Sequence, residues 1–287
     1  MKERMIDVVT PDGKMETFVT HPEDGGPFAT VVVYMDIWGV REELFEIARR
    51  IATVGYYCLV PNFYYRQGKI RHSFRDDDNR MISLHNLDQE TQNEVQAPRR
   101  KLSDAMVMRD TGALIEFLRS EERVRDGAAG CIGYCMGGRH VFCAAGHFPE
   151  TFRASASLHG TALITDEADS PHLLAANFRG ELYCGYGEND RFTPPTLIKK
   201  MEELLRTSPV EYRYEVHTGA DHGYALPDRD IFDARAAARD WEIFFASYLV
   251  KDVRATHAAT SMRLADWPPV TVSAQRRTRA PTNLTSI

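Results

Sequence analysis

The stretch Gly133-Tyr134-Cys135-Met136-Gly137 decides how this chain folds. It joins GAAGCIGY, an apolar run typical of a buried strand, to MGGRHVFCAA, which we predict to be helical. Glycines two positions before and two positions after the central residue allow the strand and the helix to approach without Cβ clashes. The central residue then takes a strained backbone conformation and projects its side chain beyond the sheet. The pattern predicts a nucleophile elbow with Cys135 as the nucleophile.

A cysteine at this turn has other conceivable roles. A disulfide to Cys131 needs a Cα separation below about 7 Å, whereas four residues of strand span roughly 13 Å. A zinc site needs further cysteines or histidines at close spacing, and none accompanies Cys135, so we predict no metal. A redox pair needs a resolving cysteine, and the position of Cys58, Cys143 and Cys184 relative to Cys135 stays open. An inert buried thiol suits the other four cysteines but leaves the glycines around Cys135 without a purpose.

Outward from this turn, the chain alternates between buried strands and amphipathic helices. FATVVVYM and YYCLVP are uninterrupted apolar runs, which are typical of strands buried on both faces of a parallel sheet. Segments 5–10 and 15–20 flank PDGK, a turn signal, and so predict a hairpin. We therefore predict an α/β fold with a mainly parallel central sheet flanked by helices on both faces. The remaining strands are FRASASLHG, ELYCGYG and VEYRYEVHT, with helices at 41–53, 102–118, 136–145, 194–206 and 231–250.

We expect one α/β domain over residues 1–250. Residues 67–97 are polar and charged and fall where a strand should lead into a helix. They form either a solvated excursion or a flap over the site, since long loops in compact domains are often functional. Residues 251–287 show no periodicity and predict an extended C-terminal tail. Docking of that tail against a second subunit, and hence a homo-oligomer, is left open.

The composition excludes several kinds of partner. A formal net charge of −6 lacks the basic character that nucleic-acid binding requires. No apolar stretch approaches the roughly 18 residues of a membrane helix, and Asp7 interrupts the N-terminus before a signal peptide could form. Five cysteines, an odd number, indicate reduced thiols. We therefore predict a cytoplasmic protein with a small-molecule substrate.

A cysteine nucleophile needs a general base, and the base needs an acid that orients it. The strand ELYCGYG leads into an acidic loop in which we favour Asp190 over Glu188. The strand VEYRYEVHT leads into a loop with His222, which we favour because His217 still lies within the strand. Nucleophile, acid and histidine, each after a strand, is the chain order of α/β-hydrolases. We predict Cys135, Asp190 and His222 as the catalytic residues.

An oxyanion hole would complete such a site. In this architecture one donor is the N–H of the residue after the nucleophile, here Met136. The second comes from the loop after the strand FATVVVYM, which reads MDIWGV, so Ile37 is the predicted donor. Losing one such donor typically costs about 3 kcal/mol of transition-state stabilisation.

GYCMGG, GENDRFTPP and ADHGY together resemble the dienelactone hydrolase family of α/β-hydrolases, over about residues 30–250. The resemblance implies the α/β-hydrolase fold, a triad of Cys135, His222 and Asp190, no metal or organic cofactor, and the opening of an enol-lactone ring. Family members carry a glutamate after the third strand that hydrogen-bonds the resting thiol. Asp36, shorter by a methylene, takes that position here, and we expect it to tune the thiol.

The substrate pocket departs further from the family pattern. Family members that act on the dienelactone place an arginine four residues after the histidine to grip the substrate carboxylate, and this chain has Leu226 there. Other arginines could supply that grip, and aromatic residues after two of the buried strands could line the pocket. Each candidate has surface exposure or core packing as its alternative role. The candidates are Trp38, Tyr64, Tyr65, Arg66, Arg139 and Arg229.

We thus predict a cytoplasmic, cofactor-independent hydrolase that opens a lactone or cleaves a small carboxylic ester through a cysteine thioester. One alternative is an esterase or thioesterase that acts on an acyclic substrate. A second alternative, from a different class, is a protein of this fold that binds a small ligand without turning it over. A thiol peroxidase or redox sensor would need a resolving cysteine within reach of Cys135.

Overall fold

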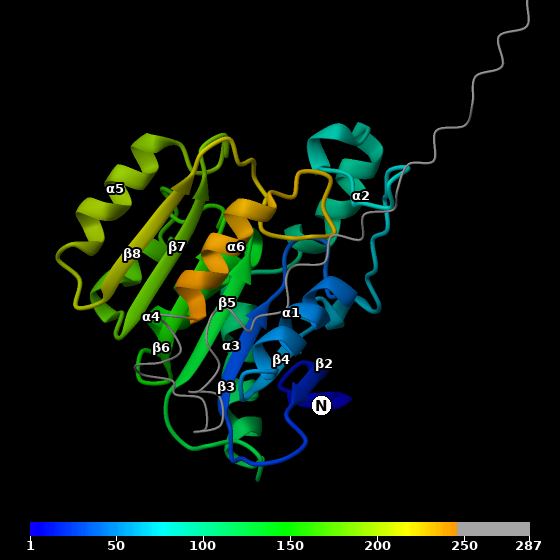
Figure 1. Cartoon of the computed structure of the whole chain (residues 1–287), viewed down its shortest axis with the longest axis vertical. Coiled ribbons are helices and arrows are strands. Elements are labelled where there is room, and N and C mark those ends of the chain that lie inside the picture. Colours follow the sequence, from blue (N-terminus) through cyan, green and yellow to red (C-terminus); the bar gives the residue numbers. More distant parts are fainter. Residues whose placement is uncertain (246–287) are drawn as a thin grey trace, which may run out of the picture.

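The computed structural model describes residues 1–245, so the predicted tail at 251–287 lies outside the described residues. Eight strands form one sheet in the order β1-β2-β4-β3-β5-β6-β7-β8 (Figure 1). The strands are β1 Lys2–Thr10, β2 Gly13–His21, β3 Ala29–Tyr34, β4 Tyr56–Pro61, β5 Ala129–Tyr134, β6 Phe152–Leu158, β7 Glu181–Gly187 and β8 Glu211–His217. The α-helices are α1 Glu42–Ala52, α2 Gln89–Arg100, α3 Asp104–Arg119, α4 Met136–His147, α5 Pro195–Leu205 and α6 Ala234–Ile243. Short 3₁₀ helices lie at Tyr65–Gln67, Leu84–Asn86 and Pro171–Asn177.

The sheet is parallel except at its N-terminal edge. β1 and β2 pair as the predicted antiparallel hairpin, and β2 pairs antiparallel with β4. From β4 onward all neighbouring strands run parallel. All six residues of β3 are buried, which is why its sequence is an unbroken apolar run. This arrangement confirms the predicted mainly parallel α/β sheet.

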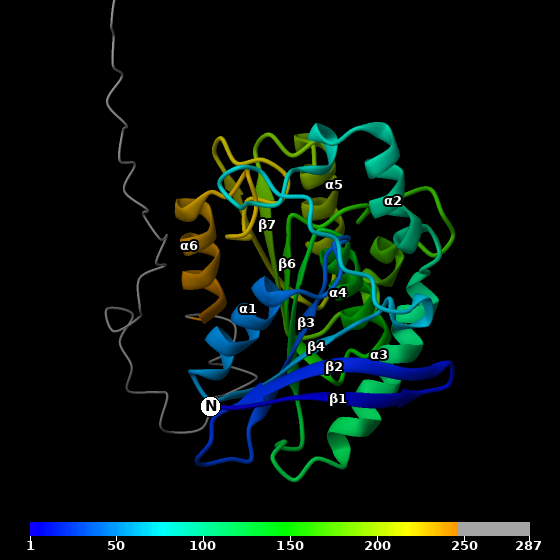
Figure 2. The ribbon, with the colours of Figure 1, turned by 90° about the vertical axis from the view of Figure 1, so that its right-hand side faces the viewer.

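Helices cover both faces of the sheet. Figure 2 shows α1 and α6 on one face and α3, α4 and α5 on the other. In α1 the buried residues share one stripe, whereas charged residues occupy the solvent side. The predicted helix 231–250 is found as α6 from residue 234, and residues beyond 245 are outside the described part. None of the described helices has the length and apolar character needed to span a membrane.

The turn between β5 and α4 has the geometry that its glycines predict. Cys135 takes φ 55° and ψ −115°, a left-handed conformation that costs a non-glycine residue energy. A Cβ on Gly133 would collide with the carbonyl of Gly137, and a Cβ on Gly137 would lie 2.8 Å from the carbonyl oxygen of Met35. The two glycines therefore allow α4 to press against β5 and against the end of β3. This contact sets the loop after β3 beside Cys135.

The segment between β4 and α3 contains a helix, α2, that the sequence pattern did not predict. Residues 67–100 of this segment, called the roof segment here, pack over the carboxyl ends of the strands through a small core formed by Trp38, Met81 and Val95. The Met81 N–H donates to the Asp228 carbonyl at 2.7 Å, and the Ser83 hydroxyl lies 2.5 Å from the Asp230 carboxylate. The segment is therefore packed and hydrogen-bonded to the C-terminal part of the domain.

Candidate active site

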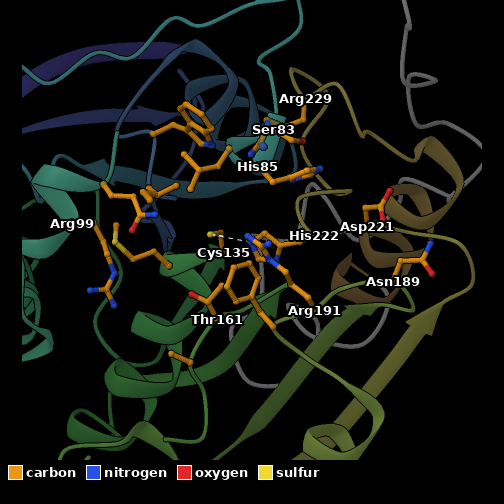
Figure 3. Close-up of a pocket in the computed structure, with 17 residues that line it drawn as sticks. Ser83, His85, Arg99, Cys135, Thr161, Asn189, Arg191, Asp221, His222 and Arg229 are labelled. Atoms are coloured by element: carbon orange, nitrogen blue, oxygen red, sulfur yellow. Dashed lines mark hydrogen bonds between the residues drawn. The ribbon is translucent and has the colours of Figure 1, made fainter. Parts of the chain in front are cut away.

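Three strand ends bring Cys135, His222 and Asp190 into one line. Cys135 follows β5, Asp190 follows β7 and His222 follows β8, so the parallel strands deliver all three to the same edge of the sheet. His222 Nε2 lies 3.1 Å from the Cys135 sulfur, the contact drawn as a dashed line in Figure 3. His222 Nδ1 lies 2.8 Å from Asp190 Oδ2. A thiol, an imidazole and a carboxylate in this order can transfer a proton from sulfur to nitrogen and stabilise the resulting imidazolium.

The surroundings of His222 favour its protonated form. Burial alone would lower the pKa of His222, but the Cys135 thiolate and the hydrogen bonds with Asp190 and Cys135 outweigh burial and raise it to about 10. Because a carboxylate only accepts hydrogen bonds, Nδ1 carries a proton toward Asp190 and Nε2 faces the sulfur. The site therefore favours the imidazolium form of His222, with Nε2 directed to the Cys135 sulfur.

The other acid and the other histidine weighed from the sequence lie elsewhere. Asp190 is held in place because its second carboxylate oxygen accepts the Phe192 N–H at 2.8 Å. Glu188 instead accepts the Gly219 N–H at 2.8 Å on the surface. His217 ends β8, as expected, and its Nε2 lies 2.7 Å from the buried carboxylate of Asp240.

The two predicted oxyanion donors lie after β3 and at the start of α4. Ile37 follows β3 and Met136 begins α4, and both line one pocket with Cys135. In the described part of the chain, neither backbone N–H donates a hydrogen bond. The Tyr64 hydroxyl donates to the Ile37 carbonyl at 3.1 Å and so fixes that peptide from behind. Both N–H groups are thus free to bind a ligand oxygen.

The carboxylate of Asp36, which we expect to tune the thiol, has its hydrogen-bond partners within the loop after β3. This fully buried carboxylate accepts from the Arg41 guanidinium at 2.7 and 3.0 Å and from the Trp38 N–H at 3.0 Å. Arg41 also pairs with Asp228, with Nε 2.6 Å from Oδ2. With its shorter side chain, Asp36 holds the loop after β3 through Arg41 and forms no hydrogen bond with Cys135.

A pocket of about 570 Å³ surrounds the sulfur and His222. Its walls come from the loops after β3, β5, β6, β7 and β8 and from the roof segment (Figure 3). A volume in this range suits a small organic ligand that becomes largely buried on binding. Side chains in the lining include Ile37, Trp38, Ser83, Leu84, His85, Arg99, Cys135, Met136, Thr161, Arg191, Phe192, His222 and Arg229.

Arg229 is the unusual charge in this lining. Its side chain is buried, with 5% of the residue exposed, and its guanidinium stacks 5.1 Å from the ring centroid of Trp38. Within residues 1–245 the guanidinium makes no ion pair or hydrogen bond, and its Nε is buried without a partner. Figure 3 places Arg229 beside Ser83 and His85, across the pocket from Arg99. A buried cation that lacks a protein partner and faces a pocket can bind an anionic group of a ligand.

Four further residues predicted to bind substrate do not line this pocket. Tyr64 lies behind its wall. Tyr65 and Arg66 both contact Asp110, and Arg66 also pairs with Asp12. These ion pairs of Arg66 join residues far apart in sequence, so a local sequence pattern cannot reveal them. In the same way, Arg139 pairs with Asp104 at 2.7 Å and donates to the Ala162 carbonyl.

Several residues in the pocket or directly behind it carried no sequence signal. Ser83 and His85 lie in the polar roof segment, where no motif marks them. Thr161 and the buried His159 follow β6, and each hydrogen-bonds the backbone of Cys135. The capping residue Asp88, whose side chain accepts the Thr91 N–H at 2.8 Å, was the one local signal for α2.

The sequence matches one family of known proteins over most of its length. The model of the dienelactone hydrolase family matches residues 15–249. A relative from Methylorubrum extorquens, named "Putative carboxymethylenebutenolidase", is 28% identical over 83% of this chain and 77% of its own length. A relative of the same name from Synechocystis is 25% identical over 84% of this chain and 94% of its own length.

Solved structures share the fold. A crystal structure titled "Putative Dienelactone Hydrolase", from Klebsiella pneumoniae, superposes with a TM-score of 0.72 at 22% identity. That superposition covers 86% of this chain and 99% of the Klebsiella chain. The α/β-hydrolase fold predicted from the sequence is thereby confirmed.

Proposed function

The chain belongs to the dienelactone hydrolase family and is a hydrolase of ester or lactone bonds, and from that premise we propose that it works through a thioester on Cys135. The observation that carries this proposal is the line from the Cys135 sulfur through His222 to Asp190, with separations of 3.1 and 2.8 Å. Five free cysteines, four of them buried, support a reducing compartment such as the cytoplasm.

In the first half of the reaction the thiolate of Cys135 attacks the carbonyl carbon of the ester or lactone. The carbonyl oxygen becomes an oxyanion, which the N–H groups of Ile37 and Met136 bind. The tetrahedral intermediate then expels the alkoxide or enolate oxygen, which takes the Nε2 proton of His222. A thioester on Cys135 remains; with a lactone, the released hydroxyl or enol stays attached to the acyl group.

The second half removes the acyl group with water. Neutral His222 takes a proton from a water molecule as its oxygen attacks the thioester carbonyl. The intermediate collapses with loss of the Cys135 thiolate, and the product leaves as a carboxylic acid. Asp190 holds the imidazole orientation throughout and stabilises its protonated form.

Arg229 indicates the class of substrate. A lactone or small ester that also carries a carboxylate would pair with this buried guanidinium while its ester carbonyl lies at Cys135. The exposed arginines at the rim, Arg99 and Arg191, add positive charge around the same opening. We therefore propose an anionic lactone or ester as the substrate.

The test is hydrolysis of an enol lactone bearing a carboxylate, a saturated lactone and an activated aryl ester. Wild type is compared with Cys135→Ala and His222→Ala, with circular dichroism as the control for folding. Activity on one or more of these compounds, lost in both folded variants, together with a mass increase on Cys135 after rapid quenching, supports the thioester route. Wild-type activity that Cys135→Ala retains would contradict it.

A further inference from the structure

His159 lies directly behind the nucleophile, outside the line of three. It follows β6, has none of its surface exposed, and is anchored because its N–H donates to the Gly185 carbonyl at 2.8 Å. Its Nδ1 accepts the backbone N–H of Cys135 at 3.1 Å, and that N–H also points to the Leu158 carbonyl at 3.1 Å. The Cys135 carbonyl in turn accepts the Thr161 N–H at 3.2 Å. Residues 158–161 therefore hold the strained peptide of the nucleophile from both sides.

The hydrogen bond fixes the tautomer of His159. Since Nδ1 accepts, the proton of the neutral ring is on Nε2, and that atom is buried without a partner in the described residues. Burial, reinforced by the positive charges of His222 and Arg229, keeps the pKa of His159 well below its ordinary value. The ring is thus a neutral acceptor. A buried N–H without an acceptor is costly, so the position of this ring calls for an explanation.

The His159 ring also contacts the proposed base. Its centroid lies 5.1 Å from that of His222, with the planes at 78°, and 5.5 Å from that of Tyr224. His159 is not part of the pocket lining, so it does not touch a ligand there. Its contacts therefore include both the residue that would attack and the residue that would take the proton.

We propose that His159 is a positioning residue: its Nδ1 holds the Cys135 backbone in the strained conformation that brings the sulfur to His222. The inference rests on the proposed role of Cys135 as the nucleophile. It requires the acceptor nitrogen of the ring rather than its bulk. Cys135 has φ 55°, and a hydrogen bond to its N–H opposes relaxation of that angle.

Two substitutions separate the acceptor from the bulk. His159→Asn keeps an acceptor near the position of Nδ1 and tolerates the positive φ of 40° at this residue, but it removes the ring. His159→Phe keeps an aromatic ring and removes the acceptor. Because His159→Phe loses one hydrogen bond, we expect its kcat to fall roughly tenfold with KM unchanged. In His159→Asn, which keeps an acceptor, we expect kcat within about threefold of wild type.

Alkylation by iodoacetamide compares the two variants without any substrate. The reaction reports Cys135, because the other four cysteines are buried. Slower alkylation in His159→Phe than in His159→Asn supports the inference, even if wild type hydrolyses none of the esters and the proposed function fails. Equal rates, or the reverse order, would overturn it. Nitrogen NMR of wild type covers the case of variants that do not fold: an Nε2–H tautomer for His159 supports the inference, and an Nδ1–H tautomer refutes it.

Discussion

Replacement of Arg229 by methionine should separate recognition of the substrate charge from the reaction itself. The guanidinium is buried, unpaired within the described residues, and directed to the pocket that holds Cys135. A hydrogen bond to a charged group contributes about 1.5–3 kcal/mol. At about 1.4 kcal/mol per factor of ten, Arg229→Met should lower kcat/KM for a carboxylate-bearing ester by roughly 10- to 150-fold.

The assay compares two esters of equal size, one with a free carboxylate and one with that group as a neutral amide. Hydrolysis of the neutral ester should change by less than about threefold, because Arg229 does not touch the reacting atoms. Arg191→Met is the matched control, since Arg191 lines the same pocket but is exposed and stacks 4.9 Å from the Phe192 ring. Solvent screening predicts a small effect there on both esters.

The same substitution should not weaken the fold. An unpaired buried cation is costly, and apolar replacements of buried charges are often stabilising by about 1–4 kcal/mol. The lost stacking on Trp38 offsets up to about 2 kcal/mol of that gain. We expect Arg229→Met to raise the free energy of unfolding by about 1 kcal/mol, measured by urea denaturation. Equal losses of activity on both esters, or a marked loss of stability, would refute a role for Arg229 in binding an anion.

Three further results are expected. The pKa of His222 is raised from 6.5 to about 10. The contribution of protonated His222 to the free energy of unfolding is therefore fully present below about pH 6.5 and is lost as pH rises through 10. Cys135→Ala should flatten that decline in a pH series of urea unfolding, and an unchanged slope would contradict the ion pair. Asp240→Asn should cost about 2–4 kcal/mol in the same assay, since this buried carboxylate accepts from three buried donors; a cost below about 1 kcal/mol would contradict that role. Gly137→Ala should abolish soluble folded protein, whereas helical Gly112→Ala, with its nearest atom at 3.8 Å, should stabilise by up to about 1 kcal/mol; similar melting temperatures would contradict the close packing at the elbow.

The sequence predicted best those features that short-range chemistry determines. The spacing of glycines around Cys135 requires a tight turn wherever it occurs. The loops with Asp190 and His222 follow recognisable buried strands, and parallel strands place their carboxyl ends together. The fold and the meeting of these three residues could therefore be predicted from local pattern and chain order.

The pocket could be predicted only in part, because its chemistry depends on which distant charges find one another. Arg66 looked available for a ligand, yet Asp110 and Asp12 neutralise it. Arg229 was a candidate on the same terms as Arg66, and within residues 1–245 it is buried and unpaired. The roof segment was ambiguous because its helix has almost no apolar stripe; Val95 and Pro98 are its buried residues.

The ion pair that joins Arg41 to Asp228 has a consequence for folding during synthesis. The two residues are 187 positions apart, and Arg41 also holds Asp36 next to Ile37. On a ribosome, where N-terminal parts emerge and fold first, the loop with Ile37 is synthesised long before its second carboxylate anchor. A nascent chain released just after His222 would already contain every residue that we propose to take part in bond breaking. It would still lack this anchor, so we expect the loop with Ile37 to reach its final position only after Asp228 has been synthesised.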